Sequence, residues 1–595
     1  MLFALSLPVS AQTLKPFPRQ PSSEALKWAD AQLKKMSVDE KIGQLISIGY
    51  NAKFLNQESA EFGELRRQIT ENHVGGVIFF KGPVYESAVI ANRLQALAKQ
   101  PLLMAADLEA GAGMRFDDTI NFPWNMALGA TGNPEFARQQ GAITAREARA
   151  LGVQHLYAPV ADVNNNAANP VINVRSYGED PAEVGRFVAA FVAGAQAAGA
   201  MATAKHFPGH GDTAIDSHRG LPLINVNRQR LDSLELVPFR ASINAGVSSI
   251  MVAHIGLPQI DPTAIKPLKD AIAPVDAQEG TEIKSEQATM PATLSPVVTG
   301  EILRRDLKFD GLIVTDSLAM SGLTLYFQQD EAAVRALLAG ADMLLKPADV
   351  DAAVRGLREA VKSGRVTLQR VEQSARKILA AKYDLGLVKQ RLVDLNAIDR
   401  IVSTPDAERL ADEIAGRAIT LARDEQKLVP LANNKRVFIL AITNGDDRLT
   451  IARPFSTTLA RAGRRFDLVV LDERATPEEL SAARARAARA DIIVAALYGR
   501  TRSGAANSGS LPESGAALLN ELLQAQRPVI GISFGNPYIL QGFPKLPAYL
   551  VAYGDMPSLQ RAAALALTGQ ADITGRLPIT LPGLYPRGTG IQLKK

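Results

Sequence analysis

Short apolar runs recur along the first 350 residues of the chain, each bounded by Gly, Pro or polar residues. They span residues 42–50, 74–80, 101–109, 156–163, 201–207, 248–255, 310–318 and 341–347. The runs are apolar on both faces, which is typical of buried parallel strands. Segments with helical periodicity separate them, for example 134–152, 181–199 and 294–307. Eight strand–helix repeats predict an α/β fold, a (β/α)8 TIM-type barrel, which a last helix at 367–387 completes.

The strand and helix pattern begins again after about residue 425. Five further apolar runs follow, at 436–443, 466–472, 490–499, 527–535 and 548–554. Helical stretches at 476–490 and 513–526 lie between some of them, which is typical of a doubly wound α/β domain. We therefore expect a barrel over 24–390, a linker and helix over 391–425 and a C-terminal α/β sandwich domain over 426–595.

Two segments depart from this pattern. Residues 262–291 are polar, contain proline and have no clear period, so we expect an exposed loop insertion in the barrel domain. Residues 1–23 begin with an apolar run followed by VSAQ, a small-x-small cleavage pattern. We interpret them as a signal-peptide remnant and disordered start, which predicts export to the periplasm or the extracellular space. The alternative is a short disordered start without a targeting role.

Composition narrows the chemistry. The 595 residues are 47% hydrophobic and 21% charged, and the net charge is only +5, with acidic and basic residues interleaved. We therefore expect a globular protein with no nucleic-acid partner. No later apolar run approaches the ~20 residues that a membrane span needs. The chain has no cysteine, which excludes disulfides, thiolate nucleophiles and cysteine-bound zinc.

Polar residues collect where the predicted barrel strands end. In a TIM barrel these ends form one rim, and active sites lie there. The residues are Asp107, Glu109 and Arg115 after the third strand, Asp162 and Arg175 after the fourth, Lys205 and His206 at the fifth, His254 at the sixth and Asp316 at the seventh. One such residue can simply cap a helix or form an ion pair. Charged residues or histidines at five of eight ends predict a polar cup for a small polar ligand.

The segment KHFPGHGDTAIDSH (205–218) holds three of the six histidines, His206, His210 and His218. His206 and His210 are four residues apart, as in zinc-binding helices, but Pro208 and the glycines beside it argue against a helix. A zinc site stays an alternative on ligand type alone. A phosphate-binding loop is less well supported, because the segment does not run as a Gly-rich turn into a helix N-terminus.

The same segment suits acid–base chemistry. Asp216 and His218 are two residues apart, so in an extended loop their side chains point the same way, and the carboxylate can fix the tautomer of the imidazole. Asp316 ends a buried strand, where a nucleophilic carboxylate is held rigidly. One anchored carboxylate and one proton donor are what retaining glycoside cleavage requires, with a histidine here in place of the usual second carboxylic acid.

At these residues the chain resembles glycoside hydrolase family 3. More narrowly, it is similar to the two-domain form of the bacterial β-N-acetylglucosaminidase (β-N-acetylhexosaminidase) branch, which trims cell-wall fragments. KHFPGHGDTAIDSH carries the resemblance, and PVINVRSYGEDP (170–181) and DGLIVTDSLAM (310–320) support it. The resemblance implies a retaining, exo-acting enzyme that releases terminal β-linked N-acetylglucosamine from cell-wall or chitin-type glycans, with no metal and no organic cofactor.

The resemblance also implies roles for the rim residues other than Glu109 and for residues of the loop that follows the fifth strand. Asp316 matches the catalytic nucleophile, and His218 with its partner Asp216 matches the acid/base. The positions that bind the sugar at the −1 subsite are matched by Asp107, Arg115, Arg175, Lys205 and His206. His254, His210 and Asp162 are expected to support these residues without contacting the sugar.

The segment DLEAGAGMRF (107–116) departs from the family pattern, because Ala110 stands where the family often has glycine and Ala112 where it often has arginine. Three alternatives stay open beside the hydrolase. A histidine acid/base becomes neutral after it donates its proton and does not repel phosphate, so a β-N-acetylglucosaminide phosphorylase is one. A β-glucosidase on the same scaffold is the second, and a non-catalytic sugar-binding protein is the third.

Overall fold

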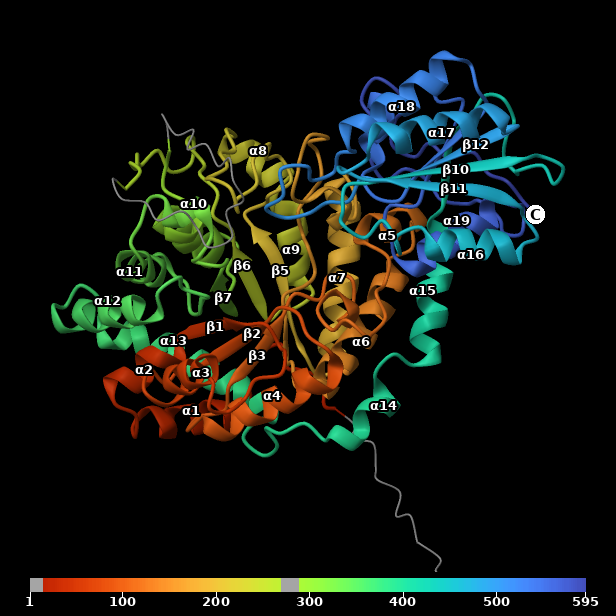
Figure 1. Cartoon of the computed structure of the whole chain (residues 1–595). Coiled ribbons are helices and arrows are strands. Elements are labelled where there is room, and N and C mark those ends of the chain that lie inside the picture. The colour runs from red at the N-terminus through yellow and green to blue at the C-terminus, as the bar shows by residue number, and fades with distance from the viewer. Residues whose placement is uncertain (1–13, 269–287) are drawn as a thin grey trace, which may run out of the picture.

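The first domain of the computed structural model, which describes residues 14–268 and 288–595, is a barrel of eight parallel strands (Figure 1). The strands are β1 (Ile46–Tyr50), β2 (Gly76–Phe79), β3 (Leu103–Ala106), β4 (His155–Leu156), β5 (Met201–Phe207), β6 (Ser249–Val252), β7 (Leu312–Thr315) and β8 (Leu344–Leu345). Their order is β7-β6-β5-β4-β3-β2-β1-β8. Backbone bonds between Met343 and both Ile313 and Thr315 join β8 to β7 at 3.0–3.1 Å. The predicted barrel is confirmed.

Helices surround the barrel strands. They are α1 (Ser23–Leu33), α2 (Val38–Gln44), α3 (Ala60–Thr70), α4 (Val84–Leu97), α5 (Asn125–Thr131), α6 (Pro134–Ala150), α7 (Pro181–Ala197), α8 (Arg228–Ser233), α9 (Leu236–Asn244), the π-helix η4 (Pro296–Asp306), α10 (Ser321–Thr324), α11 (Gln329–Ala339), α12 (Val350–Lys362) and α13 (Leu368–Asp384). Short 3-10 turns are η1 (Ala112–Met114), η2 (Asn173–Arg175) and η3 (Ala292–Leu294). The expected helices at 134–152, 181–199 and 367–387 correspond to α6, α7 and α13.

Helices α6 and α7 show why these elements form where they do. Each begins with a side-chain cap followed by proline: Asn133 accepts from the N–H of Glu135, and Asp180 accepts from the two N–H groups that follow Pro181. The two helices pack closely because Gly141 and Gly194 lie at the crossing. A Cβ at Gly194 would lie 1.9 Å from a carbonyl oxygen of α6. The pair therefore forms a rigid wall beside β4 and β5.

The second domain is built on a six-stranded sheet. Its strands are β9 (Thr420–Asp424), β10 (Val437–Thr443), β11 (Phe466–Leu471), β12 (Ile492–Tyr498), β13 (Val529–Ser533) and β14 (Ala548–Val551), in the order β11-β10-β12-β13-β14-β9. All neighbours are parallel except β14 and β9. The helices α16 (Arg453–Arg461), α17 (Pro477–Arg489), α18 (Glu513–Gln524) and α19 (Pro557–Leu567) flank the sheet. The expected α/β sandwich is confirmed.

The stretch expected as linker and helix contains a strand as well. After α14 (Ile398–Ile401) and α15 (Pro405–Ala418), residues Thr420–Asp424 form β9 and pair antiparallel with β14. The sequence TLARD is too short and too mixed in polarity to show a strand period, so only its partner strand reveals it. The chain thus enters the second domain along an edge of its sheet.

The ends of the expected insertion pair with each other. The N–H of Ile265 donates to the Ala288 carbonyl at 3.0 Å, and the N–H of Met290 donates to the Thr263 carbonyl at 2.8 Å. The middle of the predicted loop at 262–291 lies outside the described residues, as does most of the expected signal-peptide remnant at 1–23. Within the ranges that the structure describes, no helix is both long and apolar enough to cross a membrane.

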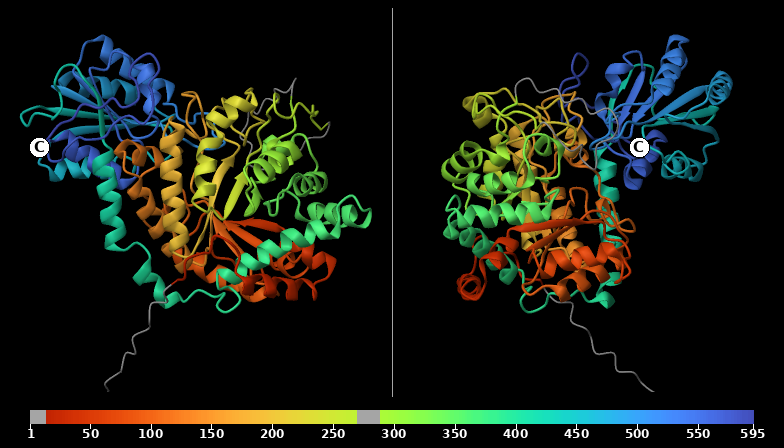
Figure 2. Two further views of the ribbon diagram at one scale, coloured as in Figure 1. Left: turned by 180° about the vertical axis from the view of Figure 1, so that it is seen from behind. Right: turned by 60° about the vertical axis from the view of Figure 1, so that its left-hand side comes forward.

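The two domains meet at the carboxyl ends of the barrel strands. In Figure 2, α15 runs along the outside of the barrel toward the second domain. Glu179, on the loop before α7, accepts from the N–H of Thr580 at 2.6 Å and from its hydroxyl at 2.6 Å. The amide of Asn164 donates to the Tyr538 hydroxyl at 2.9 Å. These contacts place loops of the second domain beside the rim of the barrel.

Candidate active site

Asp107 and Lys205 lie at the centre of a polar cup on the barrel rim. Asp107 follows β3 and Lys205 lies within β5, so the barrel holds both backbones. Lys205 Nζ contacts Asp107 Oδ1 at 2.6 Å and Glu109 Oε1 at 2.8 Å. Arg115 Nη2 contacts the other oxygen of Asp107, also at 2.6 Å. Asp107 is thus held between two cations while its side chain stays 16% exposed, open to a ligand.

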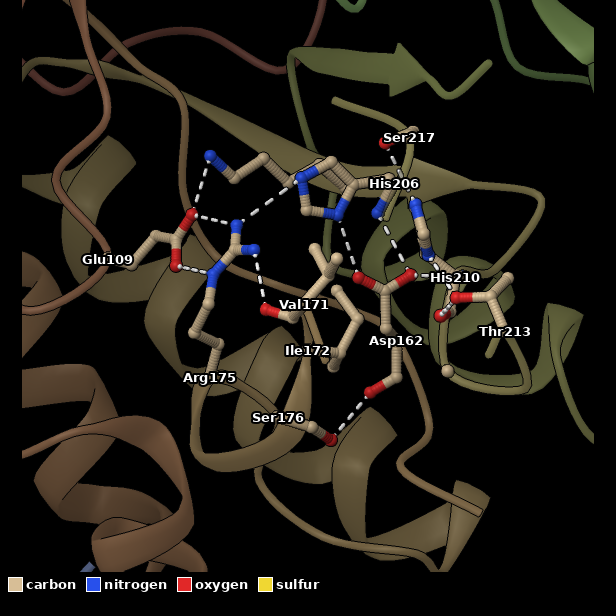
Figure 3. Close-up of polar contacts among 12 residues, drawn as sticks. Glu109, Asp162, Val171, Ile172, Arg175, Ser176, His206, His210, Thr213 and Ser217 are labelled. Atoms are coloured by element: carbon tan, nitrogen blue, oxygen red, sulfur yellow. Dashed lines mark hydrogen bonds and ion pairs between the residues drawn. The ribbon is translucent and has the colours of Figure 1, made fainter. Parts of the chain in front are cut away.

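Glu109 and Arg175 form a buried two-fold ion pair next to this group. Arg175 Nε donates to Oε2 at 2.8 Å and Nη2 donates to Oε1 at 2.7 Å, while Nη1 donates to the Val171 carbonyl at 3.0 Å (Figure 3). A paired guanidinium and carboxylate fix each other in one plane. The side chain of Glu109 is fully buried, so its function is to orient Arg175 and Lys205 rather than to meet a ligand.

The charges of this cup stabilise one another. Burial favours the neutral acid, but Lys205 and Arg115 outweigh burial and hold the pKa of Asp107 well below its usual range. Arg175 and Lys205 do the same for Glu109, whose pKa also lies well below its usual range. The pKa of Lys205 is in turn raised, since Asp107 and Glu109 outweigh its burial. All these groups are therefore ionised at neutral pH.

His206 is fixed in one tautomer by Asp162. Asp162 Oδ2 contacts His206 Nδ1 at 2.8 Å, and its Oδ1 accepts from the backbone N–H groups of His206 and His210 at 3.1 and 2.7 Å (Figure 3). Asp162 is fully buried, yet His206 and His210 hold its pKa below the usual value against the effect of burial. An ionised carboxylate only accepts, so His206 carries a proton on Nδ1. Its Nε2 lies 3.5 Å from Arg175 Nη2 and faces the cup.

His210 shapes the loop that follows β5. Its Nδ1 lies 2.8 Å from the Thr213 hydroxyl and its Nε2 lies 3.1 Å from the Ser217 hydroxyl. Burial lowers its pKa to about 4, so the ring is neutral at physiological pH. The amide of Asn169 donates to the carbonyls of His210 and Gly211 at 2.8 and 2.9 Å, which ties the loop to the segment that carries Arg175.

Asp216 and His218 form a close pair on the same loop. His218 Nδ1 lies 2.8 Å from Asp216 Oδ1, and the backbone N–H of His218 donates to the same oxygen at 2.9 Å. Asp216 is 3% exposed in its side chain, and His218 is 37% exposed. Burial opposes charge on both groups, but their contact lowers the pKa of Asp216 to about 2 and raises the pKa of His218. Nε2 of His218 is left as the nitrogen that can exchange protons with a ligand.

A loop of the second domain reaches this pair. The backbone N–H of Gly504 donates to Asp216 Oδ2 at 2.6 Å. The loop is anchored by Ser508, whose hydroxyl donates to the Pro170 carbonyl at 2.6 Å and accepts from the N–H of Arg502 at 2.9 Å. Sequence analysis assigned no role in the site to the second domain, and the Gly504 contact shows that this domain contributes a backbone N–H to it.

Asp316 follows β7 and is surrounded by histidines. Its Oδ1 accepts from the N–H of Ser317 at 2.7 Å. Burial would raise its pKa, but the fields of His206, His254 and His218 outweigh burial and keep the pKa below its usual value. His254 is fully buried and contacts the Ser317 carbonyl through Nε2 at 2.8 Å and the Thr293 hydroxyl through Nδ1 at 2.8 Å. Asp316 is thus a carboxylate held at a fixed place in the rim.

The loop with His218 is docked on the segment that follows Asp316. The Ser321 hydroxyl donates to the His218 carbonyl at 2.6 Å, and the N–H of Gly322 donates to the Ser217 carbonyl at 3.1 Å. A Cβ at Gly322 would lie 3.2 Å from the same carbonyl oxygen, so a small residue is needed there. The two predicted catalytic groups are therefore carried by segments that touch.

Models of two protein families cover this chain. The model of the glycosyl hydrolase family 3 N-terminal domain matches residues 37–381, and that of the glycosyl hydrolase family 3 C-terminal domain matches residues 329–586. The chain belongs to glycosyl hydrolase family 3. The predicted family resemblance is confirmed, and the protein is a glycosidase.

Relatives of this family 3 glycosidase include acetamido-sugar enzymes. A beta-N-acetylglucosaminidase/beta-glucosidase from Cellulomonas fimi is 30% identical over 568 residues, which are 93% of this chain and 96% of that protein. The solved structure of a family 3 beta-N-acetylglucosaminidase from Paenibacillus sp. str. FPU-7 is 33% identical, with a TM-score of 0.79 over 92% of this chain and 99% of that one. The beta-glucoside phosphorylase BglX is 27% identical, with a TM-score of 0.82 over 96% of this chain and 99% of its own.

The fold of the family 3 glycosidase brings the predicted site residues together in four groups. Asp107, Arg115 and Lys205 make one group, with Arg175 joined to it through Glu109. His206, His210 and Asp162 make the second. Asp216 with His218, and Asp316 with His254 behind it, flank the cup. Their roles in the reaction stay predictions. Among the described residues, no group of three or more His, Asp or Glu side chains is arranged to hold a metal ion.

Two residues of the site were not among the predicted ones. Glu109 was noted at a strand end but assigned no role, although its spacing of two from Asp107 places both at the same rim. Tyr157, at the end of β4, is fully buried, and its hydroxyl has no hydrogen-bond partner among the described residues. Burial, with the nearby Asp107 and Asp316, raises its pKa, so the hydroxyl is a neutral donor beside both carboxylates.

Proposed function

We propose that this family 3 glycosidase is a retaining, exo-acting β-N-acetylhexosaminidase that releases terminal β-linked N-acetylglucosamine from cell-wall or chitin-type glycans. Export to the periplasm or extracellular space, where peptidoglycan is accessible, is part of this proposal. The observation that carries it is the Asp216–His218 pair: an imidazole with a raised pKa, fixed through Nδ1 and open at Nε2. The names of the Cellulomonas and Paenibacillus relatives support the acetamido sugar.

The first step forms a glycosyl-enzyme. The Asp316 carboxylate attacks the anomeric carbon while the bond from that carbon to the leaving oxygen breaks. Protonated His218 gives its Nε2 proton to the leaving oxygen, and Asp216 stabilises the imidazolium until the transfer. Asp107, Lys205 and Arg175 bind sugar hydroxyls and the acetamido group. Lys205 is paired with Asp107 and Arg175 with Glu109, so these four charges cancel and the residues orient a neutral sugar without a large net field.

The second step releases the sugar. Neutral His218 accepts a proton at Nε2 from a water molecule, whose oxygen attacks the anomeric carbon and displaces Asp316. His206 presents Nε2 toward the cup because Asp162 holds the proton on Nδ1, so it accepts from a sugar hydroxyl. The buried Tyr157 hydroxyl, without a hydrogen-bond partner among the described residues, is left as a donor for the reacting carboxylate.

Phosphorolysis is the second candidate. After the first step His218 is neutral and does not repel an anion, as an aspartate or glutamate would. Phosphate can then replace water as the acceptor and give a sugar 1-phosphate. The similarity to the solved structure of a beta-glucoside phosphorylase, at 27% identity, supports phosphorolysis as the second candidate.

Hydrolysis of an aryl β-N-acetylglucosaminide and of the matching aryl β-glucoside tests the proposal, each with and without phosphate. We expect strong preference for the acetamido sugar, free N-acetylglucosamine as product, and a rate that phosphate does not change. Preference for the glucoside would assign the enzyme to the glucosidase alternative, and a sugar 1-phosphate would assign it to the phosphorylases. Saturable sugar binding without any turnover would leave only the non-catalytic binding protein.

A further inference from the structure

A second cavity lies between the domains, apart from the charged residues of the cup. Its volume is about 450 Å³, within the usual range for small-molecule sites. Its lining includes Asp447, Arg500, Phe534 and Asp555 from the second domain and Trp124 from the barrel domain. None of the predicted site residues lines it. Of the residues that line the cavity, Val174 is the one next in sequence to a predicted site residue, Arg175.

The cavity lies where an open α/β sheet binds ligands. Strand order in the second domain is β11-β10-β12-β13, so the chain moves to one side of β10 for β11 and to the other side for β12. The loops after β10 and β12 therefore separate and leave a crevice at the carboxyl ends of the strands. Asp447 lies in the first of these loops and Arg500 in the second, and both line the cavity.

Glycines form much of the wall of this cavity. A Cβ at Gly445 would lie 1.6 Å from Arg500 Nη2, and a Cβ at Gly554 would lie 2.8 Å from Cδ1 of Trp124. A Cβ at Gly535 would lie 2.4 Å from the Gly499 carbonyl oxygen. Larger residues at these positions would displace the guanidinium and the indole, so the shape of the hollow depends on backbone that carries no side chain.

Arg500 holds two carboxylates at the cavity. It contacts Asp447 through both terminal nitrogens, Nη1 at 2.8 Å and Nη2 at 2.7 Å, and its Nη1 contacts Asp555 at 3.2 Å. The side chain of Asp447 stays 37% exposed and that of Asp555 stays 25% exposed. The carboxylates are therefore fixed in orientation by one cation and still have lone pairs directed to solvent, which suits pairs of hydroxyl donors.

Trp124 completes the site with a flat apolar surface. It immediately precedes α5, is partly exposed, and lies against the backbone of Gly554 across the domain boundary. An indole packs against the apolar C–H face of a sugar ring, while carboxylates accept from the equatorial hydroxyls at its edge. With Arg500 already paired to two carboxylates, the cavity has little excess charge for an ionic ligand.

We propose that this cavity is a second sugar-binding site that holds one neutral sugar unit of a glycan, between Trp124 and the carboxylates of Asp447 and Asp555. The proposal goes beyond the proposed function, because it holds whichever sugar the cup cleaves. The loop that begins at Arg500 continues to Gly504, which contacts Asp216. The second site therefore lies on the other end of the same loop that supports the catalytic pair.

Tryptophan fluorescence tests the proposal directly. The chain has two tryptophans, and Trp28 packs on Tyr383 in the barrel domain with ring centroids 5.8 Å apart. In Trp28→Phe combined with Asp316→Asn, which prevents turnover, Trp124 is the single reporter. We expect N,N′-diacetylchitobiose to change its emission saturably. The change should persist when Asp107→Ala removes the cup as a binding site, and Asp555→Asn should weaken the binding at least tenfold.

Calorimetry gives an independent count of sites. The Asp316→Asn enzyme should bind two molecules of N,N′-diacetylchitobiose per chain, and adding Trp124→Ala to it should remove one of them. Trp124→Ala in the enzyme that keeps Asp316 should still hydrolyse a small aryl glycoside. If the cup does not bind this sugar, calorimetry should find one site, and Trp124→Ala should remove that site. Failure of the proposed function can therefore be told apart from failure of this proposal. Three results would each overturn the proposal of a second sugar site. The first is loss of the Trp124 fluorescence change in Asp107→Ala, and the second is an unchanged number of bound sugars in Trp124→Ala. The third is a fluorescence change with the dipeptide alanyl-alanine but not with the sugar.

Discussion

The backbone N–H of Gly504 donates to Asp216 Oδ2 at 2.6 Å, across the boundary between the two domains. The other oxygen of Asp216 accepts from His218, so both carboxylate oxygens are occupied. Stabilisation of the ionised carboxylate by the second domain lowers the pKa of Asp216, and an ionised Asp216 keeps the pKa of His218 raised. The docking of the second domain therefore tunes the predicted acid/base on the first.

Removal of the predicted nucleophile should abolish turnover and spare binding. Asp316→Ala is expected to lower kcat by a factor on the order of 10⁴ or more, because no covalent intermediate can form. The sugar should still bind, since Asp107, Lys205 and Arg175 are unchanged. Calorimetric titration with N-acetylglucosamine beside single-turnover kinetics checks both parts. A variant that turns over at more than a tenth of the wild-type rate would place the nucleophile elsewhere.

The pH profile should report His218. The imidazolium is the acid of the first step, so kcat/KM is expected to fall as pH rises through the raised pKa of His218. Asp216→Asn removes the carboxylate that stabilises the imidazolium, which lowers that pKa. The alkaline limb should therefore move to lower pH, with a loss of about 10²-fold at pH 7 on substrates with poor leaving groups.

Asp212→Asn is the matched control for this experiment. Asp212 lies on the same loop, its one charged partner in the described part of the chain is Arg230, at 3.5 Å, and its side chain is 32% exposed. The control should leave the alkaline limb in place. Equal profiles for the two variants would mean that Asp216 does not tune the acid.

The anchor of the Gly504 loop can be tested separately. Ser508→Ala removes the hydroxyl that contacts both the Pro170 carbonyl and the N–H of Arg502. We expect kcat/KM to fall about fivefold, the equivalent of about 1 kcal/mol for one hydrogen-bonded anchor, with a small shift of the alkaline limb to lower pH. Ser510→Ala, two residues further on an exposed site of the same loop, should change neither quantity.

A buried glutamate away from the site should make stability depend on pH. Glu147 in α6 is 1% exposed, and within the described ranges only one of its oxygens has a partner, the N–H of Ser403 at 2.8 Å. Burial raises its pKa from 4.5 to about 7. The folded state thus binds the proton more tightly than the unfolded state, so stability is lost as pH rises from about 4.5 to about 7 and stays lower above that range.

Glu147→Gln removes this dependence. At about 1.4 kcal/mol for each pKa unit, the wild type loses about 2.5 kcal/mol of stability through Glu147 between pH 5 and pH 8, so the variant should gain that much relative to wild type over this range. Urea unfolding at pH 5 and at pH 8 measures this gain in the free energy of unfolding. Glu135→Gln on the same helix is the control: Glu135 is 44% exposed, and its change should stay within about 0.5 kcal/mol. A gain of equal size at both pH values would contradict the assignment.

The pattern of apolar residues was enough to predict the barrel strands and the second sheet, because buried parallel strands appear in the sequence as apolar runs between glycines and prolines. The rim residues followed from the same pattern, since Asp107, Lys205 and Asp316 each end such a run. Strand β9 could not be found this way, because its five residues become a strand only through β14. The Gly504 contact was equally hidden: a backbone N–H leaves no signal in the sequence, and its partner is 288 residues away.

The partners of β9 bear on how much of this sheet edge is open to pairing with another chain. β9 has β14 on one side, and on the other the N–H of Ile591 donates to the Leu421 carbonyl at 2.8 Å, while Leu593 pairs with Ile573. Residues 591–593 thus cover part of the open edge of β9. Without that short strap, the unpaired N–H and C=O groups of β9 would offer a template for intermolecular strand pairing. The strap therefore leaves less of this edge open to pairing with another chain.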